Sequence, residues 1–330
     1  MAEIYTYGEL LAENMRKLPN QDLSENHIFH GPFPSGAPTI FISTCSQLGH
    51  KTKIWGGVGK DKFGDAIIKR LERDGIDTTY VKRSDKTTAV AFVAYDDKGE
   101  REFIFHINNT AADDFKFVKD QNIPDCFHVM GCSMMASERF KIGIEHAVDY
   151  YSSMGSEVSF DPNLRPELLK GRSFREVAGK IMDETTIFLP GVGELLLAAY
   201  NVETTVAKDD DRNAAIEDAV NVLWEKYPKM KIINVKLGGD GCVIYQRDQK
   251  PVFIPVYDLT KKEPLLDATG AGDTFDATFV SCYLDGMEIE KAGFMASKAG
   301  ALNVVAFGPM EAEIKRLHEK ILPIDDKYLD

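Results

Sequence analysis

Short apolar runs alternate with amphipathic segments along most of this chain of 330 residues. The runs have the length and composition of buried strands, and the segments between them repeat apolar residues every three or four positions, as helices do. This alternation favours right-handed βαβ crossovers, and therefore a mainly parallel sheet with helices on both faces. Ligands of such sheets bind at the carboxyl ends of the strands. The predicted strands span residues 53–58, 127–130, 158–160, 187–189 and 232–237, and the clearest helices span 63–73, 138–154 and 212–227.

Two segments depart from this alternation. Residues 87–107 are predicted to form a β-hairpin, because turn-forming residues 96–99 divide them and Phe103, Phe105 and Ile107 share one face. Residues 10–33 are irregular and interrupted by prolines. Since an isolated hairpin is only marginally stable in water, we expect both segments to form one small sheet that covers the site as a lid. The prediction is one domain, residues 1–330, with a lid made from about residues 9–35 and 86–113 inserted into the α/β core.

Charge and composition exclude several classes of function. The chain has 39 basic and 52 acidic residues, a net charge of -13, which argues against nucleic acid or an anionic membrane surface as a partner. No run approaches the roughly 18 apolar residues of a membrane-spanning helix, and no signal peptide is apparent at the N-terminus. The five scattered cysteines form no C-x-x-C pair, so neither a disulfide framework nor a zinc cluster is expected. We therefore expect a cytoplasmic protein with reduced thiols.

Residues 267–275, Asp-Ala-Thr-Gly-Ala-Gly-Asp-Thr-Phe, carry the strongest chemical signal. Gly270 and Gly272 let the backbone turn tightly and approach an anion, and the helical pattern from Asp273 onward places this turn at a helix N-terminus. The free amides and the helix dipole at that point favour a phosphoryl group that gains negative charge. Asp273 could accept the proton of a substrate hydroxyl, so the pattern predicts a phosphoryl-transfer site.

The alternative for this stretch is an ordinary βα turn, in which Asp273 only stabilises the helix dipole. The dipole would also favour the ionised carboxylate and make Asp273 a weak base. Two other nucleotide-binding classes lack their motifs, since the chain has neither the Rossmann G-x-G-x-x-G after its first strand nor the P-loop G-x-x-x-x-G-K-[ST]. A nucleotide is therefore expected at the late glycine turn.

Motifs spread over nearly the whole chain resemble the ribokinase-like (PfkB) family of sugar kinases. Residues 267–273 match the family signature DxTGAGD, and residues 8–10, 35–38, 47–49 and 57–64 are similar to its first signature region. Residues 160–165 resemble its substrate-side strand end, and residues 236–241 its nucleotide-side strand end. The resemblance implies an α/β fold, the ribokinase-like three-layer α/β/α sandwich with a mainly parallel sheet and a small β-sheet lid. It also implies an ATP-dependent carbohydrate kinase.

The resemblance further assigns roles to residues. At the reaction centre, the base would be Asp273 and the anion hole would be formed by Gly270, Ala271 and Gly272. The nucleotide groove would be lined by Lys236, Gly238 and Gly241, with residues 296–303, including Ser297 and Asn303, near the adenine. Sugar or transferred phosphate would be contacted by Glu13, Gly36 and Arg165. Mg²⁺ would be organised through water by Glu194, and a monovalent cation, expected to be an activating K⁺, by Asp267 and Thr269.

Some of these side chains have a structural alternative. Lys236 could form an ion pair instead of meeting phosphate, and Arg165 could pair with a helix acid instead of clamping phosphate. Glu13 could be a solvated edge residue. Asp161 and Asn163 could belong to the site or could only fold the Asp-Pro-Asn turn.

Three positions depart from the family pattern. Gly191 replaces the asparagine of an NxxE motif, Ile40 replaces an asparagine that meets sugar hydroxyls, and Glu13 is longer than the usual aspartate. The sugar is therefore open: we expect phosphorylation of a primary hydroxyl of a ketose or keto-sugar acid, of the tagatose or fructose type, with 2-keto-3-deoxygluconate as the alternative. A catalytically weak sugar-sensing pseudokinase is the alternative of another class, although the intact Asp273 argues against it. An exposed lid edge predicts a homodimer through the lid.

Overall fold

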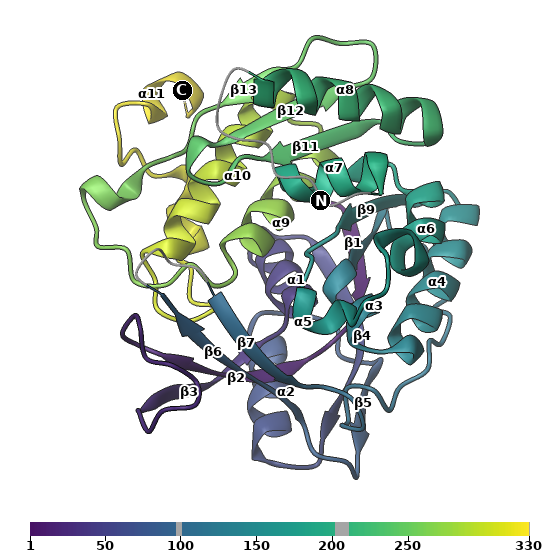
Figure 1. Ribbon diagram of the computed structural model, residues 1–330, viewed down its shortest axis with the longest axis vertical. Helices are drawn as coiled ribbons and strands as arrows, with labels where there is room; N and C mark the ends of the chain where they lie inside the picture. Colours follow the sequence, from purple (N-terminus) through teal and green to yellow (C-terminus); the bar gives the residue numbers. More distant parts are fainter. Residues whose placement is uncertain (97–100, 202–210, 330) are drawn as a thin grey trace.

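The structure is a computed structural model that describes residues 1–96, 101–201 and 211–329 (Figure 1). Within these residues a nine-stranded sheet has the order β13-β12-β11-β10-β9-β8-β1-β4-β5, parallel from β5 to β11 and antiparallel from β11 to β13. The strands are β1 (Glu3–Tyr7), β4 (Lys51–Gly59), β5 (Val81–Ser84), β8 (Cys126–Met130), β9 (Glu157–Asp161), β10 (Ile187–Phe188), β11 (Ile232–Lys236), β12 (Cys242–Gln246) and β13 (Val252–Ile254).

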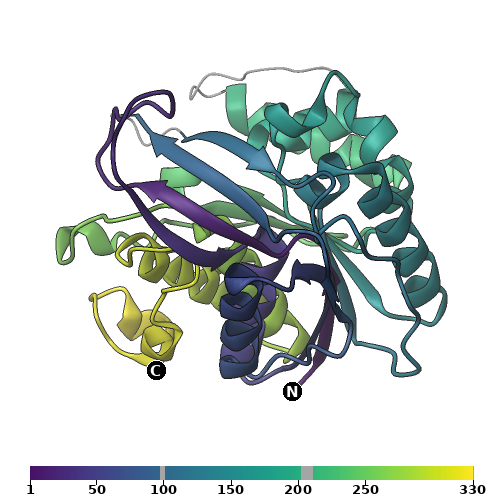
Figure 2. The same cartoon turned by 90° about the horizontal axis from the view of Figure 1, so that it is seen from below.

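Helices cover both faces of this sheet because its strands alternate their side chains between two buried cores. On β1, Tyr5 and Tyr7 enter one core and Ile4 enters the other. Figure 2 shows the two helical layers on opposite sides of the sheet. The first core is covered by α3 (Gly131–Ala136), α4 (Glu138–Ser153), α6 (Phe174–Glu184), α7 (Val192–Tyr200) and α8 (Asp211–Lys226), and the second by α1 (Ala37–Gln47), α2 (Lys62–Arg73), α9 (Ala271–Leu284) and α10 (Ile289–Val304).

A second sheet of four strands lies apart from the main one, with the order β3-β2-β6-β7 (Figure 1). Its pairs β2–β3 and β6–β7 are antiparallel, whereas β2 and β6 are parallel. The prediction that the irregular N-terminal segment and the hairpin share one small sheet is confirmed, although most of the predicted hairpin turn lies outside the described residues. We call this sheet the lid sheet. Its strands are β2 (Leu11–Arg16), β3 (Phe29–Ser35), β6 (Ala89–Tyr95) and β7 (Arg101–His106).

The predicted α/β fold is confirmed, and each predicted strand and helix lies within about two residues of an observed one. The antiparallel edge made by β12 and β13 was not predicted, because two short strands joined by a tight turn leave no helical crossover in the pattern. Over the part of the chain that the structure describes, no helix has both the length and the apolarity needed to cross a bilayer.

Candidate active site

The glycine turn before α9 has a backbone that only glycine can adopt comfortably. Gly270 has φ of 81°, and a Cβ there would lie 2.6 Å from the carbonyl oxygen of Pro309. The helix begins at Ala271, and its first amides have no partner inside the helix. A Cβ on Gly272 would meet no atom within 4 Å, so the space in front of this helix end is open. The amide of Ala271 already donates to the carbonyl of Ala268 at 3.3 Å, so the predicted anion would meet the amides of Gly272 and Asp273.

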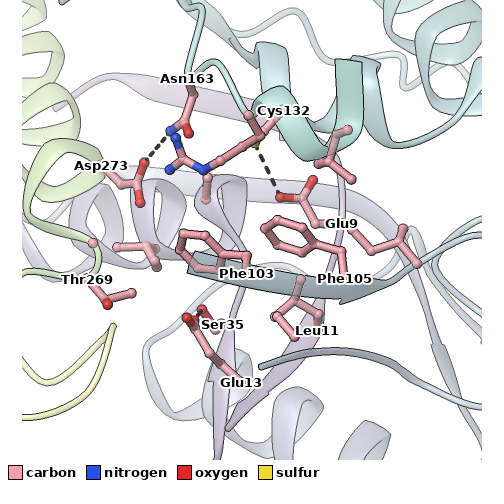
Figure 3. Close-up of a pocket in the computed structure, with 18 of the residues that line it drawn as sticks. Glu9, Leu11, Glu13, Ser35, Phe103, Phe105, Cys132, Asn163, Thr269 and Asp273 are labelled. Atoms are coloured by element: carbon pink, nitrogen blue, oxygen red, sulfur yellow. Dashed lines mark hydrogen bonds between the residues drawn. The ribbon is translucent and has the colours of Figure 1, made fainter. Parts of the chain in front are cut away.

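Two hollows meet at this turn. The first, which we call the lid cavity, lies between the turn and the lid sheet and includes Gly270 and Asp273 in its lining (Figure 3). The second, which we call the apolar groove, includes Ala271 and Gly272 and runs along α10. Ionisable or polar side chains in the lid cavity are Glu9, Glu13, Ser35, Arg101, Cys132, Asn163, Arg165, Thr269 and Asp273.

Asp273 is buried and points into the lid cavity, where Asn163 Nδ2 donates a hydrogen bond of 2.9 Å to its Oδ1 (Figure 3). Burial raises the pKa of Asp273 to about 7, and the nearby charge of Asp161 adds to the rise, while Arg165 and Lys236 oppose it. This corrects the expectation of a low pKa from the helix dipole, because the loss of hydration on burial is the largest cause of the shift. Near neutral pH the carboxylate is consequently a stronger base than an exposed aspartate.

Asn163 combines the two alternatives considered for the Asp-Pro-Asn turn. Its backbone amide donates to Asp161 Oδ1 at 3.0 Å, which is the Asx turn, and its side chain reaches Asp273. Lys236 joins the neighbouring acids, with its Nζ 2.7 Å from Asp276 and 3.1 Å from Asp161. The structural ion pair predicted as an alternative is thus present, although Lys236 also borders the apolar groove. Burial alone would raise the pKa of Asp161, but the ammonium of Lys236 holds it below its usual value.

Arg165 lines the lid cavity, and its guanidinium carbon lies 5.6 Å from the ring centroid of Phe103. Its Nη1 donates 2.9 Å to the carbonyl of its neighbour Leu164. Arg101 on β7 lines the same cavity and was not predicted as a site residue. The signal for it was present, since Arg101 shares the inward face of the strand with Phe103 and Phe105 at a period of two. Neither arginine forms an ion pair with a carboxylate of the described residues, so the helix-acid alternative for Arg165 is not met.

Glu13 is not a solvated edge residue, because β2 lies inside the lid sheet and the side chain is only 3% exposed. Ser35 Oγ donates to its Oε2, whereas its buried Oε1 has no partner among the described residues (Figure 3). Burial raises the pKa of Glu13 to about 7. An unpartnered buried carboxylate oxygen is costly unless a ligand or water completes it, so this atom could accept a hydrogen bond from a ligand in the cavity.

Gly36 and Glu9 form the neighbouring wall of the lid cavity. Gly36 has φ of 113°, and a Cβ there would lie 2.4 Å from the carbonyl oxygen of Glu9. The side chain of Glu9 accepts hydrogen bonds from Ser133 and, at 3.5 Å, from Cys132 (Figure 3), and burial raises its pKa. Glu9 was not predicted as a site residue, although it lies two residues beyond the carboxyl end of β1. Ile40 also lines this cavity, so the expected asparagine is replaced by an apolar surface.

Both carboxylate oxygens of Glu194, in the first turn of α7, accept backbone amides. Oε1 accepts from the amide of Leu164 and Oε2 from the amide of Gly191, each at 2.7 Å. Burial and the charge of Asp161 raise the pKa of Glu194. No cluster of three or more His, Cys, Asp or Glu side chains suited to a metal exists among the described residues. A carboxylate engaged in this way fits contact with Mg²⁺ through water rather than directly.

The oxygens of Asp267 and Thr269 face Tyr95 of the lid strand β6. The Tyr95 hydroxyl lies 2.8 Å from Asp267 Oδ1 and 2.6 Å from Thr269 Oγ1. Asp267 also accepts the amides of Thr269 at 2.9 Å and Gly308 at 3.1 Å. These contacts stiffen the glycine turn and connect it to the lid sheet. Tyr95 was not predicted as a site residue, because no motif marks it.

The apolar groove contains Gly238, Gly241 and Ser297 as predicted, together with Phe275, Ala301 and Val304. Asn303 corrects the prediction for the adenine region, because it is completely buried and does not line the groove. Its Nδ2 donates 2.7 Å to the carbonyl of Thr269, and its Oδ1 accepts from Thr274 at 3.1 Å. On α10 the groove face carries Ser297, Gly300, Ala301 and Val304, and Asn303 points instead at the glycine turn.

Comparisons with known proteins agree with this geometry. A family model described as pfkB family carbohydrate kinase matches residues 36–316. An uncharacterized sugar kinase of Archaeoglobus fulgidus is 31% identical over 81% of this chain and 96% of its own length. Fructokinase-1 of Oryza sativa subsp. japonica is 29% identical over 96% of this chain and 97% of its own. A solved E. coli structure, described as a candidate ribokinase II in complex with ATP and Mg²⁺, superposes with a TM-score of 0.80 at 31% identity, covering 96% and 99% of the two chains.

Proposed function

The chain belongs to the pfkB family of carbohydrate kinases, and from this premise we propose that it transfers the γ-phosphate of ATP to a primary hydroxyl of a ketose or keto-sugar acid, with tagatose or fructose favoured. The observation that most directly supports this proposal is the position of the glycine turn between the lid cavity and the apolar groove. Asp273 opens to the lid cavity, and Ala271 and Gly272 open to the apolar groove. A sugar hydroxyl in the cavity and a nucleotide in the groove would therefore meet at the helix N-terminus.

Each part of the proposed phosphoryl transfer is assigned to particular residues. Asp273, with its pKa raised to about 7, accepts the hydroxyl proton while Asn163 holds its carboxylate in place. The amides at the start of α9 face the group whose oxygens gain negative charge. Mg²⁺, when bound, would neutralise charge on the phosphates, and Glu194 would hold its water. The lid sheet covers the cavity and limits the entry of water.

Glu13 supports a neutral ketose as the acceptor. Its buried, unpartnered Oε1 and the lone pairs of the Ser35 hydroxyl, whose proton is donated to Glu13 Oε2, offer acceptors suited to sugar hydroxyls. The names of several relatives, which are fructokinases of plants, point in the same direction.

Arg101 and Arg165 favour the second candidate, a keto-sugar acid such as 2-keto-3-deoxygluconate. Both guanidinium groups border the lid cavity, and neither has a carboxylate partner in the described parts of the chain. Two cations without an ion-pair partner are suited to an anionic ligand, although the buried carboxyls of Glu13 and Asp273 line the same cavity. Arg165 would serve the transferred phosphate, and Arg101 would then be available for a carboxylate of the acceptor.

The test is release of ADP by the purified protein with Mg²⁺, ATP and a panel of tagatose, fructose, ribose and 2-keto-3-deoxygluconate, with the product identified by mass. Asp273→Asn is the control for phosphoryl transfer. Arg101→Met separates the candidates, because it should raise KM for the keto-acid at least about 10-fold and leave a neutral ketose nearly unchanged. Sugar binding without sugar-stimulated ADP release would contradict the kinase proposal and favour the sensing pseudokinase.

The proposal extends to the surroundings of the site. We propose K⁺ as an activator near Asp267 and Thr269, a homodimer through an exposed edge of the lid sheet, and a cytoplasmic location. Exchange of K⁺ for Na⁺ in the assay should lower turnover, and light scattering should give twice the monomer mass. The exposed Ile104 on edge strand β7 is the position to change, since Ile104→Lys should yield monomers.

A further inference from the structure

One wall of the apolar groove is a segment that belongs to neither a β-strand nor an α-helix. Five consecutive residues, 256–260, line the groove, and they form irregular backbone that passes into the short 3₁₀ turn η2 (Leu259–Lys261). We call these five residues the groove wall. Irregular backbone holds its shape only through contacts made by its side chains and amides. The wall must therefore be fixed from outside the groove.

The C-terminal segment, residues 316–328, supplies this fixation. Tyr257 of the wall donates its hydroxyl to Asp325 Oδ2 at 2.8 Å. Asp325 Oδ1 in turn accepts from Lys298 of α10 at 2.9 Å, and both charged side chains are completely buried. The amide of Tyr257 also donates 2.8 Å to Ser297, which lines the groove. Tyr257 is thus held through its hydroxyl by the C-terminal segment and through its backbone amide by α10.

Two further contacts join the same segment to the continuation of the wall. Lys262 donates to the carbonyl of Ile321, and Arg316 forms a fork with Glu263, at 2.5 and 3.1 Å. Asp325 Oδ2 also accepts the amides of Ile321 and Leu322, at 2.5 and 2.7 Å, so the turn before α11 (Asp325–Tyr328) presents the carboxylate inward. Figure 1 shows α11 beside α10 on this side of the molecule.

We propose that Asp325 and Lys298 are positioning residues for the nucleotide: they fix Tyr257 and with it the groove wall, so the C-terminal segment sets nucleotide affinity. This inference rests on the proposed use of the groove as the nucleotide site. The segment lies almost entirely beyond residues 36–316, the span matched by the family model. Neither residue lines the groove, so the effect on the nucleotide passes through Tyr257.

The main test is binding of Mg·ADP, without sugar, to Tyr257→Phe by calorimetry. This change removes one hydroxyl and keeps the ring that packs 5.7 Å from Phe294. We expect the dissociation constant to rise about 3- to 10-fold, the size of one lost hydrogen bond. KM for the sugar should stay within about 2-fold in the same variant, because Tyr257 is absent from the lid cavity lining.

Tyr328→Phe is the matched control. This change removes a hydroxyl of the C-terminal segment that is hydrogen-bonded to Glu290 at 3.1 Å. It keeps the ring, which stacks on Phe294 with 4.1 Å between centroids. Tyr328 has no bond to the groove wall among the described contacts, so Mg·ADP affinity should match that of the unmodified protein.

Asp325→Asn provides a stronger version of the test, with a larger expected loss of affinity because Lys298 also loses its counter-charge. If that variant does not fold, Tyr257→Phe alone decides. Unchanged Mg·ADP affinity in Tyr257→Phe, with or without a lower melting temperature, would show that the contacts only stabilise the fold and would overturn the inference. Absence of Mg·ADP binding by the unmodified protein would instead overturn the proposed function of the groove.

Discussion

The lid cavity and the apolar groove share one glycine turn but are lined by different kinds of residue. The cavity is lined by charged and polar side chains from many elements, including Glu13 on β2, Arg101 on β7 and Asp273 on α9. The groove is lined mainly by glycine backbone and apolar side chains around β11, the groove wall, α9 and α10. Burial raises the pKa of both Glu13 and Asp273 to about 7 in the cavity. The lid cavity therefore contains most of the ionisable groups of the site whose charge changes near neutral pH.

This difference in lining corresponds to two kinds of ligand recognition. Backbone amides and apolar surface bind phosphate and a flat base with few specific side chains, so the groove side can be recognised from its glycines. Hydroxyl and carboxylate groups are distinguished by individually placed polar side chains, and each misplaced or missing partner is costly. In the proposed function, the turn between the two regions would supply the chemistry, and the cavity would decide which acceptor reaches it.

The largest effect is expected on the cavity side of the turn. Asp273→Asn should lower kcat by about 10² to 10⁴, because base assistance is of that size, while Mg·ADP affinity changes little. Steady-state kinetics and calorimetry measure the two quantities. Asp285→Asn at the far end of α9 is the matched control and should retain full activity. Near-normal kcat in Asp273→Asn would show that the cavity does not contain the base.

On the groove side, Gly272→Val keeps the backbone amide but should crowd the phosphate position, and we expect kcat/KM to fall about 100- to 1,000-fold, as when one anion-hole donor is lost. Stability should change little, because a Cβ at Gly272 meets no atom within 4 Å. Gly193→Val on α7 has the same open surroundings but lies outside both hollows, so it should leave kinetics intact. Equal kinetics in the two variants would exclude the groove face of the turn from phosphate binding.

A third prediction concerns stability and pH. The native pKa of Asp273, about 7, exceeds the unfolded value near 4, so the folded state binds more protons between these pH values and becomes less stable as pH rises. Asp273→Asn removes this penalty and can still accept the hydrogen bond from Asn163. It should raise the free energy of unfolding by about 1 to 4 kcal/mol at pH 8 and by almost nothing near pH 4. Denaturant titrations at both pH values measure the change, and an equal effect at both would contradict it.

The smallest effect is expected at Glu13. Ionised Glu13 accepts sugar hydroxyls better than the protonated form, so KM for the sugar should fall as pH rises through about 7. Glu13→Gln should raise KM about 10-fold at pH 8 and remove its pH dependence, while the pH dependence of kcat from Asp273 persists. Glu102→Gln, on the outward face of β7, is the control in the lid sheet. A pH-dependent KM that survives Glu13→Gln would place the titrating group elsewhere.

Much of the fold could be predicted, because periodic apolar patterns are local properties of the chain. The helix after the glycine turn was expected from residue 273 and begins at Ala271, and the lid sheet was expected from two segments that cannot be stable alone. Arg101 was missed as a site residue although it shares a strand face with Phe103 and Phe105, because that pattern does not show that the face covers a cavity. Glu9 was missed because its role depends on which elements become neighbours. Asn303 was misplaced because a range along a helix does not specify which side faces the groove.

The sequence by itself determined the α/β class, the glycine turn and the kinase chemistry, since each shows as local patterns or motifs whose order along the chain is visible without the fold. Tertiary structure decided the pKa of Asp273, the pairing of Lys236 with Asp161 and Asp276, the arginine pair in the cavity and the fixation of Tyr257 by Asp325. Burial and charge separation depend on distance in space, and these contacts join residues tens of positions or more apart in sequence. No local pattern records such distances.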